Sequence, residues 1–284
     1  MIDVSICIVT YNSQDYITEC IKSIKEKTIS TNYEILIIDN ASKDNTISHI
    51  EDCGNIKLIK NNKNTGFANA ANSIAKKAQG KYILFLNPDM ILKNEAIDVL
   101  FKTAENNKDY SLFGGKISNL EGNYIFSFGF LPSLKDILSI CARKPQNIKP
   151  QKRNINKEQE TEIITGCCFF IKKSTFQILK EFDEDYFMYY EEIDFCKRMK
   201  DKNYKAFYTP NAEFIHYVSK SEKNKYLTSA YNIRSSYLYC KKHFADKINT
   251  LTLKITFLCF PFFQKENTKN IQELFRTLSF ILKN

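Results

Sequence analysis

Residues 81–89 constrain the fold of this chain more than any other stretch, because a continuous apolar run stops there at a proline. The apolar residues 82–86 are typical of a strand that is buried on both faces of a parallel sheet. Asn87 precedes Pro88 and so favours extended geometry, which ends the strand. We therefore expect Asp89 at the carboxyl end of a central strand, where open α/β sheets bind ligands. An isolated Asn-Pro-Asp is also compatible with a turn that merely enters a helix.

The first ninety residues alternate between apolar runs and helical patterns. Strands are expected at residues 4–10, 34–38, 56–59 and 82–86, and helices at about 15–27, from Ser42 or Lys43 onward, and from Gly66 through Ala78. This alternation predicts βαβ units and a parallel sheet with right-handed crossovers.

Polar residues follow each of these strands: Thr10 and Asn12, Asp39 and Asn40, Asn64 and Gly66, and Asn87 and Asp89. Because the carboxyl ends of parallel strands share one edge of a sheet, the pattern predicts a ligand-binding edge. Each residue also has a structural alternative. Helix capping suits Ser13 and Ser42, and Gly66 is a turn glycine that also lets backbone N–H groups face an anion. The sequence has neither Gly-x-Gly-x-x-Gly nor a P-loop, which disfavours a dinucleotide dehydrogenase or a P-loop enzyme.

The second half of the sequence is more irregular. A helix is expected near 93–105, and strands at 112–117, 124–128, 162–171, 206–208 and 213–217, the last of which carries His216. Residues 142–161 are polar and basic, which predicts a mobile loop. Residues 182–196 are densely aromatic and acidic, and the helix that follows is expected to turn Ile193, Cys196 and Met199 inward.

The positive charge of the chain is concentrated at one end. The net charge is +9, yet residues 219–284 hold twelve Lys and Arg against four Asp and Glu, so residues 1–218 are nearly neutral. A basic tail of this kind can meet the phosphates of a nucleic acid or of a membrane surface. A nucleic-acid binder is disfavoured, because it is expected to show basic residues interleaved with exposed aromatics across its main face.

The cysteines and the apolar segments indicate the compartment. The nine cysteines are scattered, form no Cys-x-x-Cys pair and lie in several cases within apolar runs, which predicts buried thiols in a reducing compartment. The chain opens directly into a strand pattern, so no signal peptide is expected. No stretch reaches the roughly 18 apolar residues of a membrane span. A cytoplasmic protein is therefore expected.

Seven motifs in this order resemble the inverting family 2 glycosyltransferases, and within them the bacterial rhamnosyltransferase-like branch. They are IVTYNS (8–13), IIDNASKD (37–44), NTGFA (64–68), FLNPD (85–89), TGC (165–167), FMYYEEIDFC (187–196) and His216. The resemblance covers residues 1–218. It implies the α/β GT-A fold, a Rossmann-like, mixed and mostly parallel sheet with flanking helices, in which residues 1–90 bind the nucleotide and residues 91–218 form the acceptor and catalytic half.

The resemblance implies transfer of a sugar from a nucleoside diphosphate sugar to a hydroxyl of a glycan or lipid-linked saccharide, with inversion, in the synthesis of cell-surface polysaccharide. Rhamnose from dTDP-rhamnose is the first candidate donor, and a UDP-hexose is the next. Such a reaction needs neutralisation of the leaving diphosphate, a general base for the acceptor hydroxyl, and in-line positioning.

The resemblance also assigns residues to the donor. It implies that Thr10, Tyr11, Asn12, Asp39, Asn40, Asn64, Gly66, Phe67 and Asn87 bind the nucleotide. A divalent cation, Mn²⁺ or Mg²⁺, would be held by Asp89 and His216. Asn87 stands where the family's Asp-x-Asp motif has its first acid, which puts strong metal binding without the donor in doubt. His216 has an alternative role as a histidine of the core.

Two neighbouring carboxylates compete for the role of base. The resemblance implies Glu192, with Glu191 as the competitor, and an aromatic setting would raise the pKa of one of the two. The alternative is an acidic helix start that suits the helix dipole. Thr165, Gly166 and Tyr190 are the expected acceptor-side residues, although such tyrosines are more often part of a core.

The remaining residues, 219–284, are expected to form a basic amphipathic helical extension. This extension has two alternative roles. It binds peripherally at the inner face of the cytoplasmic membrane, or it packs on the domain or in a homodimer. Two other functions stay open. A sugar nucleotidyltransferase is expected to open with a Gly-rich phosphate loop, which this chain lacks, and Asn87 keeps open a catalytically degenerate module that only binds nucleotide sugars.

Overall fold

The computed structural model describes residues 1–141, 154–217, 225–249 and Ser279. The chain divides into two compact units. The first consists of Met1–Phe130, Arg153–Glu184 and Glu191–Ser219. The second consists of Leu131–Lys152, Asp185–Tyr190 and Lys220–Asn284. Each unit is described on its own below.

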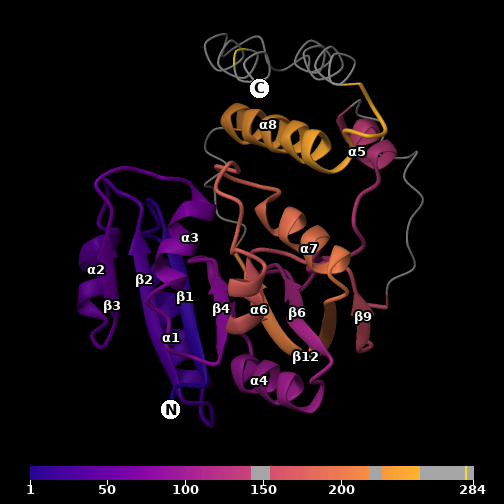
Figure 1. The fold of residues 1–284 in the computed structure, drawn as a ribbon. Helices are drawn as coiled ribbons and strands as arrows, with labels where there is room; N and C mark the ends of the chain where they lie inside the picture. The colour runs from indigo at the N-terminus through magenta and orange to yellow at the C-terminus, as the bar shows by residue number, and fades with distance from the viewer. Residues whose placement is uncertain (142–153, 218–224, 250–278, 280–284) are drawn as a thin grey trace. The chain divides into compact units, whose positions relative to one another are not determined.

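The first unit is built on a ten-stranded mixed sheet, drawn in Figure 1. Its main path runs β3 (Lys57–Lys60), β2 (Tyr33–Asp39), β1 (Val4–Thr10), β4 (Tyr82–Leu86), β11 (Cys168–Lys172), β6 (Tyr110–Ser118), β12 (Lys205–His216) and β5 (Met90–Leu92). The first four strands are parallel to one another, whereas β11 runs antiparallel to both β4 and β6. Two short strands pair at the side of this path, β7 (Tyr124–Ile125) with β6 and β9 (Gln159–Thr161) with β12.

The order of the parallel strands creates a switch point between β1 and β4. From β1 the chain moves outward to β2 and β3, and then returns to the other side of β1 as β4. Open α/β sheets bind ligands at such a point, outside the carboxyl ends of the strands. Thr10 ends β1, and the Asn87–Asp89 turn follows β4, so both lie at this point.

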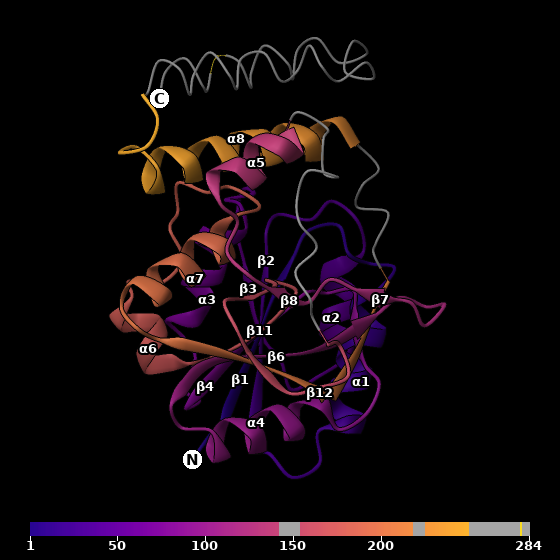
Figure 2. The same ribbon diagram turned by 90° about the vertical axis from the view of Figure 1, so that its right-hand side faces the viewer.

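Helices cover both faces of the sheet, as expected. Figure 2 shows α3 (Phe67–Ala75), α6 (Lys173–Ile178) and α7 (Glu191–Asp201) on one side, and α1 (Ile17–Lys27) and α2 (Thr46–Asp52) on the other. In addition, α4 (Ala96–Asn106) packs against β6 and β12. These helices bury the apolar strands, of which β4 is buried along its whole length.

The second unit contains α5 (Leu134–Cys141) and α8 (Lys225–His243), which contact each other. Part of the helical extension expected over 219–284 is thus present as α8, in which Tyr237 is fully buried. The part of the expected extension after residue 249 lies outside the described residues except for Ser279.

Several expectations for single elements were wrong. Residues 159–161 form β9 instead of part of a loop, because β12 offers them an antiparallel partner. The two strands expected at 206–208 and 213–217 are one strand, β12, with an irregularity between Thr209 and Glu213. Residues 124–128 and 162–171 each divide into two strands, and the second short pair is β8 (Phe128–Gly129) with β10 (Ile163–Ile164). Ile193 is only half-buried, whereas Cys196 and Met199 are buried as expected.

The two expected serine caps were also wrong. The Ser13 hydroxyl does not cap α1, which begins after Tyr16 without a side-chain cap. Ser42 lies before α2 but donates its hydroxyl to Asp39, and the Asp44 carboxylate accepts the Thr46 N–H at the start of that helix.

Candidate active site

Three polar groups, two of them buried, meet at the ends of β1 and β2. Thr10 and Asp39 are fully buried, and the Thr10 hydroxyl donates to Asp39 Oδ1 over 3.1 Å. Ser42 donates its backbone N–H to Asp39 Oδ2 over 2.9 Å and its hydroxyl to Oδ1. The carboxylate of Asp39 is therefore held in one orientation at the sheet edge, by neighbours from two strands' ends. Sequence reasoning missed Ser42 here and treated it as a helix cap.

The loop after β1 is fastened to the loop after β2. Asn12 has a left-handed backbone with φ of 51°, which asparagine tolerates better than most residues. Its N–H donates to Ser42 Oγ over 2.8 Å, and its Oδ1 accepts the Lys43 N–H over 2.8 Å. Tyr11, beside it, is 46% exposed. The exposed Tyr11 thus directly follows Thr10, whose hydroxyl donates to the buried Asp39 carboxylate.

Asn40 ties the loop before α3 to the end of β2. Its Nδ2 donates to the Gly66 carbonyl over 3.1 Å, and its Oδ1 accepts from the Thr65 hydroxyl over 3.2 Å. The Gly66 N–H in turn donates to Asn64 Oδ1 over 2.9 Å. Gly66 has φ of 84° and immediately precedes α3, so a residue with Cβ would be strained here. The expected residues Asn40, Asn64 and Gly66 thus form one connected group.

Phe67 lies in the first turn of α3, but its ring packs on Phe182 with 6.0 Å between ring centroids. The side chain of Phe67, which was expected to bind the nucleotide, therefore packs against another ring. Asn87 is half-buried, and its N–H donates to the Cys167 carbonyl over 3.1 Å. That bond fixes the turn after β4 to the segment 165–167.

Asp89 and His216 are brought together by β5, a strand that the sequence did not reveal. The antiparallel pairing of β5 with β12 sets His216 opposite Met90, and the Tyr217 N–H donates to the Asp89 carbonyl over 3.0 Å. His216 Nε2 lies 3.1 Å from Asp89 Oδ1, and the side chains are 17% and 8% exposed, respectively. His216 is therefore not a histidine of the apolar core, because its ring faces a carboxylate at the ligand edge.

The side chains of Asp89 and His216 are of chemical types that suit a divalent cation. A carboxylate oxygen and an imidazole nitrogen are two ligands of suitable type for a first-row divalent ion. Among the described residues, no group of three or more His, Cys, Asp and Glu is arranged to hold a metal. Two protein ligands leave several coordination positions, which substrate phosphates and water commonly occupy at Mg²⁺ sites.

Glu191 and Glu192 begin α7 and differ in their surroundings. Glu191 is 6% exposed, and burial together with the charge of Glu192 raises the pKa of Glu191 well above its usual range. Burial also raises the pKa of Glu192, although backbone N–H groups of Glu192, Gly166 and Ile193 partly counter the effect. The Oε2 atoms of both carboxyl groups are shielded from solvent and have no hydrogen-bond partner among the described residues.

The segment 165–167 lies near both Asp89 and Glu192. A Cβ added at Gly166 would come within 3.7 Å of Glu192, so this glycine lies directly against that side chain. Burial raises the pKa of the neighbouring Cys167 thiol to about 12, and the charges of both Asp89 and Glu192 contribute to the rise. Cys167 therefore lies within electrostatic reach of both expected functional acids, a role that the sequence did not suggest. Thr165 contacts Cys167 through its hydroxyl, which lies 3.2 Å from Sγ.

Tyr190, the third expected acceptor residue, belongs to the second unit. There its ring packs against Tyr239 of α8 with 5.6 Å between centroids. Both Tyr189 and Tyr190 have left-handed backbones, with φ of 68° and 70°. The residue that follows them is Glu191 of the first unit.

Comparison with known proteins identifies the class. Residues 5–179 match the family described as glycosyl transferase family 2. That match covers more than half of the chain, so the chain belongs to this family. It is a glycosyltransferase, as its motifs led us to expect.

The similar curated proteins are glycosyltransferases of bacteria and archaea. Rhamnosyltransferase WbbL of Escherichia coli is 26% identical over 83% of this chain and 92% of its own length. An N-acetylglucosaminyl-diphospho-decaprenol L-rhamnosyltransferase of Mycobacterium tuberculosis is 25% identical over 75% of each chain. The low-salt glycan biosynthesis hexosyltransferase Agl10 of Haloferax volcanii is 29% identical, and the match spans 71% of this chain but only 62% of that protein.

Solved structures support the fold. The mannosyltransferase PcManGT of Pyrobaculum calidifontis, in complex with GDP-Man and Mn²⁺, has a TM-score of 0.58 at 16% identity over 97% of this chain and 74% of that one. Residues 1–349 of Staphylococcus aureus TarS give a TM-score of 0.56 at 15% identity, over 99% of this chain and 80% of that one. The expected GT-A fold is thus confirmed. Within the described part of the chain, no helix is both long enough and apolar enough to cross a membrane.

Proposed function

We propose that this chain transfers L-rhamnose from dTDP-rhamnose, with inversion, to a hydroxyl of a glycan or lipid-linked saccharide. The observation that carries the proposal is the gathering of three groups at one sheet edge. They are the Thr10–Asp39–Ser42 cluster, the Asp89–His216 pair, and Glu192 against Gly166. A nucleotide, a diphosphate and an acceptor hydroxyl need such groups in succession.

The nucleoside moiety belongs at the ends of β1 and β2. Asp39, already oriented by Thr10 and Ser42, would accept hydrogen bonds from the base or ribose. Exposed Tyr11 would cover the base, and the Asn40–Gly66 group would form the surface beneath it. Preoriented groups of this kind bind without paying the full entropic cost of ordering side chains.

Asp89 and His216 would hold the divalent cation, Mn²⁺ or Mg²⁺. When bound, the ion neutralises the diphosphate as it leaves the sugar. The two structures similar in fold that contain Mn²⁺, PcManGT with GDP-Man and GalNAc-T7 with UDP and GalNAc, support a divalent cation here. Asn87 in place of an acid leaves the protein with less negative charge at this point, so the phosphates must complete the site.

Glu192 would take the proton from the acceptor hydroxyl as the oxygen attacks the anomeric carbon. Its raised pKa makes it a stronger base than an ordinary glutamate, and the Gly166 N–H holds its carboxylate in place. Glu191 is buried and adjacent, so we assign it to the support of the helix start. The segment 165–167 would receive the acceptor.

The donor and acceptor are proposed from the relatives. The Escherichia coli and Mycobacterium tuberculosis proteins are named as rhamnosyltransferases and match most of their own length, which favours L-rhamnose over a UDP-hexose. The Mycobacterium protein is named for a diphospho-decaprenol substrate, which supports a lipid-linked acceptor. With such an acceptor, the enzyme would work in the cytoplasm at the inner face of the membrane, and its basic extension would approach anionic lipid.

The first test is a thermal-shift screen with UDP, dTDP, GDP and ADP, each with and without Mn²⁺ or Mg²⁺. A ligand at 100 times its Kd adds about 2.7 kcal/mol to the stability of the folded state. We expect dTDP to give the largest shift in Tm, and this shift to shrink in Asp89→Ala. Asp52→Ala is the control and should keep the shift, because it removes an exposed acid at the end of α2. No shift with any nucleotide would favour a degenerate module.

The second test is turnover. Glu192→Gln should bind dTDP as the wild type does but lose transfer from dTDP-rhamnose to a lipid-linked saccharide by about 10²- to 10⁴-fold, the usual contribution of a general base. Turnover at the wild-type rate would refute the assignment of the base. Formation of a nucleoside diphosphate sugar and pyrophosphate from a nucleoside triphosphate and a sugar 1-phosphate would point to a nucleotidyltransferase instead.

A further inference from the structure

The loop between α6 and α7, residues 179–184, is held in an unusual conformation. Lys180 and Glu181 are consecutive residues with side chains, yet both have a left-handed backbone with φ of 62°. Left-handed backbone is unfavourable for residues with a Cβ, and it persists only where surrounding contacts impose it. We call residues 179–184 the bridge segment and ask which contacts impose its shape.

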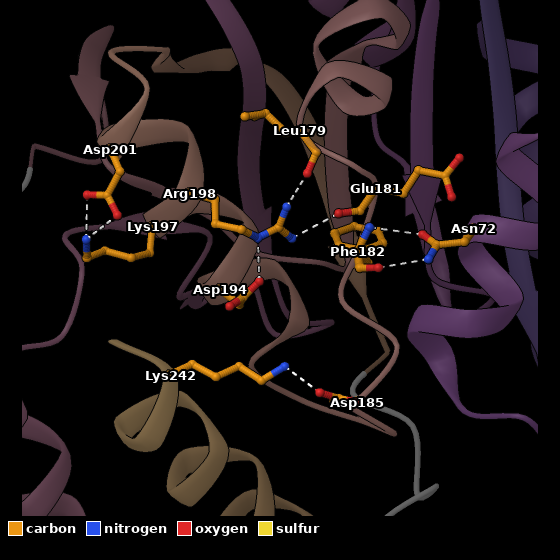
Figure 3. A network of polar contacts seen from close by, with 10 residues as sticks. All are labelled: Asn72, Leu179, Glu181, Phe182, Asp185, Asp194, Lys197, Arg198, Asp201 and Lys242. Carbon is orange, nitrogen blue, oxygen red and sulfur yellow. Dashed lines mark hydrogen bonds and ion pairs between the residues drawn. The ribbon is translucent and has the colours of Figure 1, made fainter. Parts of the chain in front are cut away.

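One set of contacts comes from α7. Arg198 donates through Nη1 to the Leu179 carbonyl and through Nη2 to the Glu181 carbonyl, the latter over 2.9 Å. Its Nε donates to Asp194 Oδ2 over 2.7 Å, and the Asp194 side chain is only 2% exposed. Figure 3 shows the guanidinium group directed at both carbonyls. One side chain of α7 thus fixes the first half of the bridge segment.

The second set comes from α3. Asn72 is 2% exposed and holds the backbone of Phe182 at both of its polar groups, as Figure 3 shows. Its Nδ2 donates to the Phe182 carbonyl over 2.8 Å, and its Oδ1 accepts the Phe182 N–H over 3.0 Å. The same amide reaches Glu184 Oε1 over 3.1 Å. The second half of the bridge segment is therefore fastened to the helix that begins at Gly66.

An aromatic cluster lies under the bridge segment. The Phe182 ring is buried, and its centroid lies 5.2 Å from that of Phe85 on β4 and 5.6 Å from that of Phe195 on α7. Phe85 lies two residues before Asn87, and Phe195 three residues after Glu192. Movement of the bridge segment would therefore disturb both the β4 turn and the catalytic helix.

We propose that the bridge segment couples α3 to α7, so that Asn72 and Arg198 are positioning residues for Glu192. Asn72 fixes the segment to the nucleotide side, and Arg198 fixes α7 to the segment. The proposal rests on the proposed function, because it takes Glu192 as the base and the start of α3 as part of the donor site. Neither residue touches a reacting atom, and both act through the placement of the carboxylate.

Arg198→Lys is the informative variant, because a lysine keeps a positive charge near buried Asp194 but cannot hold both carbonyls. We expect a loss of kcat of about 10- to 100-fold, the scale on which small misplacement of a catalytic group acts, with KM for the donor nearly unchanged. Lys197→Gln is the matched control, since Lys197 neighbours Arg198 on α7 but, among the described residues, its ammonium group pairs only with exposed Asp201. Asn72→Ala should resemble Arg198→Lys. Hydrolysis of the donor can serve as the reaction when the acceptor is unknown.

Amide hydrogen exchange supplies a readout that does not depend on turnover. In Arg198→Lys, amides of the bridge segment and of the first turn of α7 should exchange faster, whereas Lys197→Gln should leave them unchanged. The same experiment on the wild type does not depend on whether the variants fold. There, the nucleoside diphosphate that raises Tm should slow exchange in both segments. Protection confined to residues 10–12, 39–42 and 64–67 would overturn the coupling, as would wild-type kcat in folded Arg198→Lys. Retained turnover in Glu192→Gln would instead refute the base and leave the exchange result standing.

Discussion

Glu191→Gln should change the pH dependence of stability in a way that reports on the buried carboxyl pair. Burial and the charge of Glu192 raise the pKa of Glu191 well above its usual range in the folded state. In the unfolded chain, a glutamate has a pKa of about 4.3. Between these two pKa values the folded protein holds a proton that the unfolded chain releases, so stability is greatest below the window and is lost as pH rises through it.

The size of this effect follows from linkage. One proton bound only in the folded state changes the free energy of unfolding by about 1.4 kcal/mol per pH unit across the window. Glutamine cannot titrate, so Glu191→Gln does not lose this stability. As pH rises through the window, the free energy of unfolding of the variant should therefore gain on that of the wild type by that slope. A constant offset of about 1–3 kcal/mol against the variant is expected from a buried amide without partners, and it does not alter the slope.

Urea denaturation at intervals from pH 4.5 to 8.5 measures the difference. Glu26→Gln, an exposed substitution on α1, controls for the removal of a surface charge. Glu192→Gln should narrow the window, because the charge of Glu192 is one cause of the raised pKa of Glu191. A difference between Glu191→Gln and the wild type that stays constant over this pH range would refute the buried, proton-holding carboxyl.

Four further outcomes are expected. Transfer should fall on the acid side with a midpoint above the usual range of a glutamate, because the base must be ionised and burial raises the pKa of Glu192; a pH–rate profile measures it. His216→Ala should remove the metal-dependent part of the dTDP thermal shift and keep the metal-independent part, as a titration with Mn²⁺ would show. Asp39→Asn should abolish the nucleotide shift and cost about 1–3 kcal/mol in denaturation, because its amide would face the Ser42 N–H. Phe182→Ala should cost about 3–5 kcal/mol in the same assay, since it empties the centre of a ring cluster, and a loss below about 1 kcal/mol would contradict that packing.

The arrangement of residues 1–90 could be predicted because its determinants are local. Apolar runs such as residues 82–86 carry the strands, and the polar residues that follow them are placed at one edge by topology alone. For that reason Thr10, Asp39 and Asp89 were expected where the structure has them. What their side chains bond to was not predictable. Ser42, for example, has a capping residue's sequence context but turns toward Asp39, because a buried carboxylate needs donors more than a short helix needs a cap.

The arrangement of residues 91–218 depends on contacts between distant residues. The strand β5 has only three residues and follows a proline turn, so its sequence resembles the entry to α4; it forms because β12 offers a free edge. Asn72 meets Phe182 across 110 residues of sequence, and a lone asparagine within an alanine-rich helix gives no local sign of that contact. The Asp194–Arg198 pair could have been found, since its i, i+4 spacing is that of helical ion pairs.

On the proposed function, Asn87 and the short strand β5 belong to the same metal site. An Asp-x-Asp turn can supply two charges from one loop, whereas here the turn supplies one carboxylate, Asp89, and its partner His216 comes from the end of β12. The pairing of His216 with Met90 fixes the position of His216 through the sheet, so the two proposed ligands are aligned by strand pairing. A site with one carboxylate and one imidazole has little net charge with which to attract a cation alone. On the proposed function, the diphosphate would therefore contribute to metal binding, and reciprocity would then require the cation to strengthen the binding of the donor by the same factor.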